Sequence, residues 1–333
     1  MIKKCQGSVI NPKNDHNTPA VQTSRQKITL TIISTAMLVL CICGGYVLLT
    51  YNFLSKTSHA ASGPTGQVAP SEVNKAAMID GYQKRVFTDG QGHSLPYYLY
   101  QPAHYNPAHK YPLVLLLHGG GERAQPHNTP AQNRDLLFKQ DYVKVWSDTY
   151  TGAHNPHIQQ HWPTFVVVPQ VMFPHQWVNT PSREGSYKQV PHPTTELLMA
   201  KQLIDSLQKQ YTGVDPHRLY VTGVSQGGYG TWDMIERWPH YFAAAAPISG
   251  AGDPSKVDVL KDLPVWAFHG AKDPIVPVWG TRQMIAAMRA AGESPRYTEL
   301  PHGQHYIWGE IYSLNNASNP VPNFYDWLFS QKN

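Results

Sequence analysis

The chain has few cysteines, and all of them lie near its N-terminus. Cys5, Cys41 and Cys43 are the three cysteines among 333 residues. No cysteine is left for the rest of the chain, so a disulfide framework and a cysteine nucleophile are both excluded there.

The chain also carries little net charge outside its first residues. Residues 1–27 hold five basic residues against Asp15, so +4 of the formal charge of +5 lies there and only +1 remains for the rest. A nearly neutral body argues against nucleic acid as the main partner. With 41% apolar and 15% charged residues, the composition is that of a globular domain with a sizeable core.

One long run, residues 28–54, contains no charged residue. About 20 apolar residues are enough to cross a bilayer, so this run predicts a transmembrane signal-anchor. The basic tail of residues 1–27 precedes it, which places the N-terminus in the cytoplasm and the rest outside, in the periplasm or the extracellular space. The alternative is a signal peptide cleaved near Ala60, which would release a secreted protein. Both interpretations place the rest of the chain outside the cytoplasm.

Residues 55–75 are small and polar and predict a flexible linker, followed by a catalytic domain at 76–333. In that domain short apolar runs alternate with helical patterns at 194–211 and 281–291. The runs that predict buried strands are 112–117, 164–168, 219–224, 243–248 and 263–269. This alternation predicts an α/β fold, with a mostly parallel sheet covered by helices on both faces.

Ser225 lies between the predicted strand at 219–224 and a helical pattern, in the sequence Gly223-Val-Ser225-Gln-Gly227. A G-x-S-x-G turn between a strand and a helix forces the serine into a strained conformation and presents it as a nucleophile. The oxyanion that such a serine generates needs backbone N–H donors. Gln226 supplies one donor, and the loop after the strand at 112–117 supplies the other, with Gly120 favoured over Gly121. In that loop His118 is expected to give support, and a Glu122–Arg123 ion pair would fix it.

The acid and the base are expected to follow the serine in the order Asp or Glu, then His. Asp273 comes directly after the strand at 263–269, where a carboxylate can orient an imidazole; Asp253 and Asp262 are the competing carboxylates. Two histidines, His302 and His305, follow the next strand. His305 is favoured as the general base because it precedes a helical stretch.

Three further features are open to two interpretations. Trp177 and Trp308 either line the substrate pocket or pack in the core. The polar, poorly periodic stretch 122–162 is expected to cover one side of the site as a lid or rim. No zinc-type signature accompanies the histidines, and the predicted chemistry uses neither a metal nor another cofactor.

Four segments carry a resemblance to a known family: LLLHGGGER, VTGVSQGGYGTW, FHGAKDPIVPV and YTELPHGQHYIW. They resemble the carboxylesterase branch of the α/β-hydrolases, in particular the predicted peptidases that are kin to polyhydroxybutyrate depolymerases, feruloyl esterases and dienelactone hydrolase. The resemblance covers most of residues 80–330 and implies a triad of Ser225, Asp273 and His305. The family pattern GxGH is altered here, because His302 and Gln304 stand where glycines are usual.

The sequence therefore predicts a serine hydrolase that cleaves carboxylic esters, either small or linked to a polymer. One alternative is a peptidase or another acyl hydrolase on the same triad. An alternative of another class is a membrane-tethered binding module without activity.

Overall fold

The computed structural model describes residues 78–152, 155–180, 184–312, 321 and 323–333, which all belong to one compact unit. The tail at 1–27, the membrane segment at 28–54 and the linker at 55–75 lie outside the described residues. Among the residues that are described, no helix is long and apolar enough to cross a membrane.

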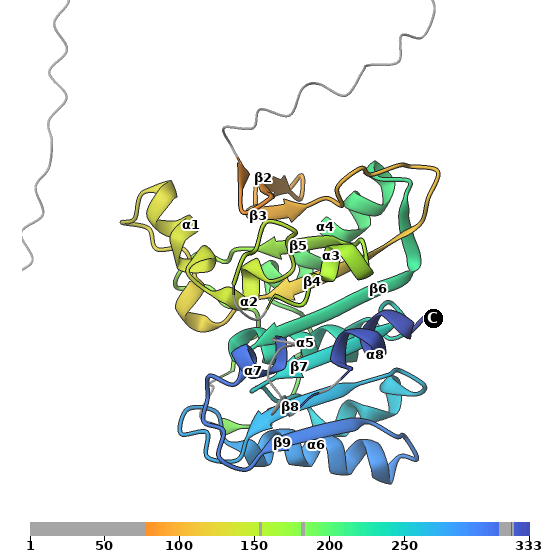
Figure 1. The fold of residues 1–333 in the computed structure, drawn as a ribbon. Coiled ribbons are helices and arrows are strands. Elements are labelled where there is room, and N and C mark those ends of the chain that lie inside the picture. The colour runs from red at the N-terminus through yellow and green to blue at the C-terminus, as the bar shows by residue number, and fades with distance from the viewer. Residues whose placement is uncertain (1–77, 153–154, 181–183, 313–320, 322) are drawn as a thin grey trace, which may run out of the picture. The chain divides into compact units, whose positions relative to one another are not determined.

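The centre of the fold is a sheet whose strands run in the order β1-β2-β3-β5-β4-β6-β7-β8-β9 through the described part of the chain (Figure 1). The pairs β1–β2, β2–β3 and β3–β5 are antiparallel, and β5, β4, β6, β7, β8 and β9 are parallel to one another. The strands are β1 (Met78–Ile79), β2 (Tyr82–Thr88), β3 (Ser94–Tyr100), β4 (Tyr111–Leu117), β5 (Phe165–Pro169), β6 (Val214–Val224), β7 (Ala244–Ile248), β8 (Trp266–Gly270) and β9 (Arg296–Leu300).

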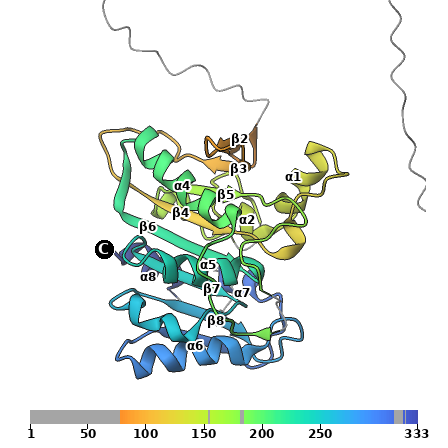
Figure 2. The ribbon, with the colours of Figure 1, turned by 180° about the vertical axis from the view of Figure 1, so that it is seen from behind.

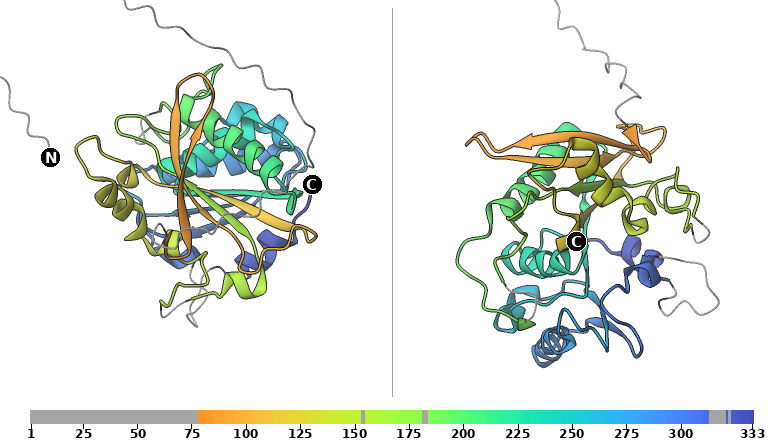
Figure 3. Two further views of the ribbon diagram at one scale, coloured as in Figure 1. Left: turned by 90° about the horizontal axis from the view of Figure 1, so that it is seen from above. Right: turned by 90° about the vertical axis from the view of Figure 1, so that its left-hand side faces the viewer.

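Helices cover both faces of this sheet, as the side view in Figure 3 shows. One face carries α4 (Thr195–Gln210), α5 (Gln226–Arg237) and α6 (Val278–Ala290), which stand in front of the sheet in Figure 2. The other face carries α1 (Pro130–Phe138), α2 (Asp141–Lys144), α3 (Ile158–His161), α7 (Trp308–Tyr312) and α8 (Phe324–Ser330). Two short 3-10 helices, η2 (Gly120–Glu122) and η4 (Pro254–Leu260), lie in loops. The predicted mostly parallel sheet with helices on both faces is confirmed.

The alternation of side chains along β4 divides the core into two layers. Leu113, Leu115 and Leu117 pack with α4, α5 and α6, whereas Val114 and Leu116 pack with the helices of the opposite face. Successive residues of a strand point to opposite faces, so an unbroken apolar run is what a strand buried on both sides requires.

The stretch 122–162, which was expected to form a lid or rim, borders the active-site cavity only in part and otherwise packs into the core. Its described residues form α1, α2 and α3, and seven of its apolar side chains join the core: Leu137, Phe138, Tyr142, Val143, Val145, Trp146 and Ile158. Each helix is too short to show a helical period, which is why the pattern was missed. Among the described residues of this stretch, Glu122, Arg123 and Gln140 reach the cavity described below.

Candidate active site

Ser225 occupies the sharp turn between β6 and α5. Its backbone has φ 54° and ψ −118°, an uncommon conformation for a residue with a side chain. The N–H of Ser225 donates to the carbonyl oxygen of Ile248 on β7 at 2.9 Å, which holds the turn against the sheet. The serine hydroxyl therefore stands at the carboxyl end of the parallel strands, on the first turn of a helix.

The glycines around Ser225 allow main chains to pack closely. A Cβ on Gly223 would collide with the backbone of Gly227, and one on Gly228 would collide with the backbone of β7. A Cβ on Gly227 would collide with the backbone at the end of β4. The glycines of the G-x-S-x-G-G sequence thus relieve contacts between backbones, because no side chain fits there.

Ser225, His305 and Asp273 form a continuous chain of hydrogen bonds. The Nε2 atom of His305 lies 2.8 Å from Ser225 Oγ, and Nδ1 lies 2.7 Å from Asp273 Oδ2. The carboxylate accepts, so Nδ1 carries the proton and Nε2 is free to accept from the serine hydroxyl. His305 is only 3% exposed. Ser225 follows β6, Asp273 lies in the loop after β8, and His305 lies in the loop after β9.

The Asp273 carboxylate is held by four donors. Its Oδ1 accepts from the N–H groups of Ile275 and Val276 at 2.8 and 2.9 Å, and its Oδ2 lies near the imidazoles of His305 and His269. Burial by itself would raise the pKa of Asp273, but the two imidazoles and the two N–H groups lower it well below its usual value. The carboxylate is therefore charged at neutral pH.

The competing residues lie elsewhere. Asp253 accepts from the N–H groups of Gln189 and Ser255, and Asp262 is exposed in the turn before β8. His302 is exposed as well, and in the structure it is His305 that reaches the serine.

The predicted oxyanion donors line the same cavity as Ser225. Gln226 is the first residue of α5 and Gly120 the first residue of η2, so neither backbone N–H has an acceptor within its own helix. The side chain of Gln226 is fixed, because Nε2 donates to the carbonyl of Val178 at 3.0 Å and Oε1 accepts from the N–H of Trp177 at 2.8 Å. Gly121 follows in the same loop and also lines the cavity.

His118 and Arg123 support the glycine loop from two sides. The Nε2 atom of His118 accepts from the N–H of Val171 at 3.0 Å, so Nδ1 carries the proton and donates to the carbonyl of Gly119 at 2.7 Å. Burial lowers the pKa of His118 to about 4, with a smaller contribution from Arg123, so the ring stays neutral.

The expected Glu122–Arg123 ion pair is absent among the described residues. The guanidinium of Arg123 instead donates to the carbonyls of Gly120, Pro174 and His175 at 2.9, 3.3 and 3.2 Å. The Glu122 side chain turns inward, where burial raises the pKa of its carboxyl.

The cavity above Ser225 has a volume of about 850 Å³, and its walls combine polar side chains with the apolar surfaces of Ile275, Tyr306 and Trp308. Trp308 lines it, but Trp177 does not: its ring is 1% exposed and its Nε1–H donates to the carbonyl of His118 at 3.0 Å. Trp177 is therefore a packing residue. Three polar side chains of the walls were not anticipated: Gln176, Asn179 and Thr180.

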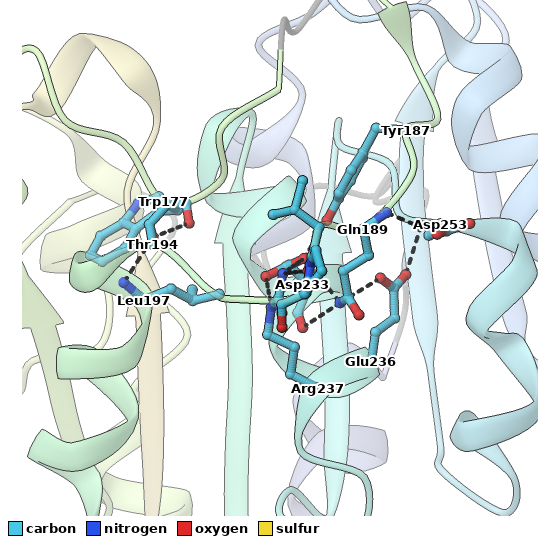
Figure 4. A network of polar contacts seen from close by, with 11 residues as sticks. Trp177, Tyr187, Gln189, Thr194, Leu197, Asp233, Glu236, Arg237 and Asp253 are labelled. Atoms are coloured by element: carbon cyan, nitrogen blue, oxygen red, sulfur yellow. Dashed lines mark hydrogen bonds and ion pairs between the residues drawn. The ribbon is translucent and has the colours of Figure 1, made fainter.

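The wall residues Gln176, Asn179 and Thr180 belong to the loop between β5 and α4, which a buried polar network holds in place (Figure 4). At one end, Thr194 Oγ1 donates to the carbonyl of Trp177 at 2.7 Å. Between these two residues along the chain, Tyr187 and Gln189 donate to carboxylates of α5 and of the loop after β7. No sequence motif signals this network, because its members are far apart in the chain.

Three carboxylates meet in that network: Asp233, Glu236 and Asp253 (Figure 4). Asp233 accepts from Tyr187 Oη at 2.8 Å and forms an ion pair with Arg237 at 2.6 Å. Burial, followed by the charge of Asp233, raises the pKa of Glu236 well above its usual value. The described residues contain no group of three or more His, Cys, Asp or Glu side chains that could hold a metal ion.

Comparisons with known proteins find esterases both by sequence and by structure. A solved thermostable esterase is 34% identical and aligns with a TM-score of 0.61 over 77% of this chain and 64% of its own. A bifunctional acetylxylan esterase/xylanase of Neocallimastix patriciarum is 23% identical over 228 residues, which are 66% of this chain and 29% of that protein. A poly(3-hydroxyalkanoate) depolymerase of Paucimonas lemoignei is 44% identical over 55 residues, 16% of this chain and 13% of that protein.

The chain spans less than a third of the length of these two curated relatives, and no family model matches it. The resemblance to esterases is nevertheless confirmed by both kinds of comparison, in sequence and in structure. The chain has the α/β-hydrolase fold, and the relatives that it resembles are named as esterases or as a depolymerase.

Proposed function

We propose that the chain hydrolyses carboxylic esters through an acyl-enzyme, with Ser225 as nucleophile, His305 as general base and Asp273 as the residue that orients the base. The observation that carries the proposal is the chain of hydrogen bonds from Ser225 Oγ through His305 to Asp273, at 2.8 and 2.7 Å. Ser225 and His305 line a cavity that Gly120 and Gln226, the proposed oxyanion donors, also line.

In the first half of the reaction, His305 Nε2 takes the proton of Ser225 Oγ while the oxygen attacks the ester carbonyl carbon. The N–H groups of Gln226 and Gly120 stabilise the oxyanion of the tetrahedral intermediate. The intermediate collapses, the bond to the alcohol oxygen breaks, and His305 returns the proton to the leaving alkoxide. Asp273 stabilises the imidazolium in between.

In the second half, a water molecule gives its proton to His305 and attacks the acyl carbon. Collapse of the second intermediate releases the carboxylic acid and restores the Ser225 hydroxyl. These steps use only groups that the chain itself supplies.

The cavity supports a short acyl group and a polar alcohol. Its walls carry the amides of Gln140, Gln176 and Asn179 and the hydroxyl of Thr180, whose burial under a long alkyl chain would cost hydrogen bonds to water. Acetyl or other short esters, free or linked to a polymer, fit these walls better than esters of long fatty acids.

The membrane anchor remains part of the proposal. Residues 28–54 would hold the enzyme to the membrane with its catalytic domain outside the cytoplasm, unless cleavage near Ala60 releases it. Membrane fractionation of the full chain and of a variant without residues 28–54 tests this. Equal amounts of both proteins in the soluble fraction would contradict it.

The activity is tested with the full chain in detergent on p-nitrophenyl acetate, butyrate and octanoate, with a dipeptide anilide as the competing substrate. We expect ester turnover that S225A and H305A both abolish and that H302A retains, since His302 is exposed and serves as the matched control. Turnover of the anilide alone would support a peptidase. Loss of the activity in H302A but not in H305A would refute the assignment of the base.

A further inference from the structure

A second histidine stands behind the acid of the triad. His269 is the fourth residue of β8, is fully buried, and does not line the cavity. Its Nε2 lies 3.2 Å from Asp273 Oδ2, the same oxygen that faces His305 Nδ1 at 2.7 Å. Two imidazoles therefore share one carboxylate oxygen, and the second one makes no contact with the reacting atoms.

The partners of its ring define the protons that His269 carries. Nε2 also lies 3.0 Å from the carbonyl oxygen of Val276, and neither this oxygen nor the Asp273 carboxylate has a proton to give, so Nε2 must be the donor. Nδ1 lies 2.7 Å from Thr281 Oγ1, whose own proton goes to the carbonyl of Gly250 at 2.6 Å. Oγ1 is then left to accept from Nδ1, which makes both ring nitrogens donors.

We propose that His269 is a positioning residue: a buried, doubly protonated imidazole that donates to Asp273 Oδ2 and thereby sets how strongly this oxygen holds the imidazole of His305. This inference rests on the proposed function of the triad. It assigns to β8 a role in the pH dependence of the reaction.

The direction of the effect follows from the shared oxygen. A donor on Oδ2 draws negative charge away from the hydrogen bond to His305 and so makes the imidazolium of His305 less stable. Without His269, His305 should hold its proton more tightly, and the acidic limb of the pH–rate profile should move to higher pH. The ring also fixes the carboxylate plane, because the two backbone donors bind only Oδ1.

Other titratable or charged groups near these three side chains stay in place in every variant below. They are Glu122 in the loop after β4, Tyr229 on α5, Lys272 beside Asp273, Tyr306 beside His305, and Glu299 on β9 with its partner Arg282.

The test compares the full chain with H269L, which removes the donor, and H269Q, which keeps a neutral one. The profile of kcat/KM for p-nitrophenyl acetate is measured against pH, and the initial burst of p-nitrophenol counts the active sites, so misfolded protein does not enter the rates. For H269L we expect kcat/KM to fall about tenfold, as for other residues that orient a catalytic group. We also expect its acidic limb to rise by about one pH unit, and that of H269Q by less.

An H269L enzyme with lower activity but an unmoved acidic limb would show that His269 only packs, and would overturn the inference; so would a limb that moves to lower pH. The ring protons give a second readout, because a doubly protonated His269 has two protected low-field proton resonances at neutral pH that H269Q lacks. A single resonance would overturn the double protonation. A wild-type chain that turns over none of the esters would refute the proposed function itself, and this inference with it.

Discussion

Replacing Gly227 with alanine should damage the site through the backbone alone. Gly227 is the second residue of α5 and packs against the end of β4. The added Cβ would lie 2.5 Å from the carbonyl carbon of Leu117 and 2.8 Å from the carbonyl oxygen of His118. Both are main-chain atoms inside the sheet, so no side chain can rotate aside to make room.

The size of the effect follows from these distances. Carbon atoms pack at about 3.5–4.0 Å, so α5 would have to move about 1 Å away from β4. Overpacking of this kind costs about 1–3 kcal/mol, or more, and alanine in place of glycine in a helix returns at most about 1 kcal/mol. We expect the free energy of unfolding of G227A to fall by about 2 kcal/mol, which lowers Tm by roughly 4–8 °C for a domain of this size.

The activity of G227A should fall further than its stability suggests. Ser225 precedes the displaced helix, and a misplacement of about 1 Å costs on the order of 100-fold in rate. G121A is the matched control, since a Cβ on Gly121 meets no atom within 4 Å. Its Tm should stay within about 1 °C of the wild-type value. Thermal unfolding and urea titration of both variants decide the matter: equal Tm values for G227A, G121A and the wild type would refute the reasoning.

Three more outcomes are expected. D273N should keep its Tm within a few degrees of the wild-type value and lose about 10³- to 10⁴-fold in kcat/KM on p-nitrophenyl acetate, because the amide no longer selects the tautomer of His305. A variant that retained a tenth of the wild-type kcat/KM would contradict this. R237M should lower the free energy of unfolding, measured in urea, by about 3–5 kcal/mol, since it leaves the buried Asp233 carboxylate without its cation. The side chain of Lys188 is 79% exposed, so K188M should change this free energy by less than about 0.5 kcal/mol. Equal losses in the two variants would count against the network. The pKa of Glu236 is raised in the folded chain, so above about pH 4.3 the unfolded chain releases a proton that the folded chain keeps, and the stability declines as the pH rises. The Tm should therefore fall less steeply between pH 5 and 8 in E236Q than in the wild type. Parallel curves of Tm against pH would refute the raised pKa.

The parallel part of the sheet could be predicted from the sequence because its strands are buried on both faces. The runs at 112–117 and 219–224 correspond to β4 and to the second half of β6, and each is almost entirely apolar. The antiparallel strands could not be identified in this way. In β2 the buried and exposed positions alternate, and Lys84 and Arg85 follow Tyr82 and Gln83, so the short apolar signal is hidden by charged side chains.

The same distinction applies to the site. Ser225, Asp273 and His305 were identifiable because a turn motif and the chain order constrain them. His269 was part of a quoted motif, but its role depends on Thr281 of α6 and on the loop that holds Val276, and no local pattern records those contacts. The polar wall of the cavity was missed for the same reason.

The position of the site follows from the topology of the sheet rather than from any single motif. The loops after β4, β6, β8 and β9 are separated by many residues along the chain, yet these strands are parallel, so all four loops emerge at one edge of the sheet. The proposed oxyanion donors come from the first two loops, the proposed acid from the third and the proposed base from the fourth. Because β4, the second half of β6 and β8 are fixed by core packing on both faces, the loops can vary in sequence while the distances between Ser225, His305 and Asp273 are kept. The departures at His302 and Gln304 illustrate this point, since they leave the 2.8 Å contact between His305 and Ser225 in place.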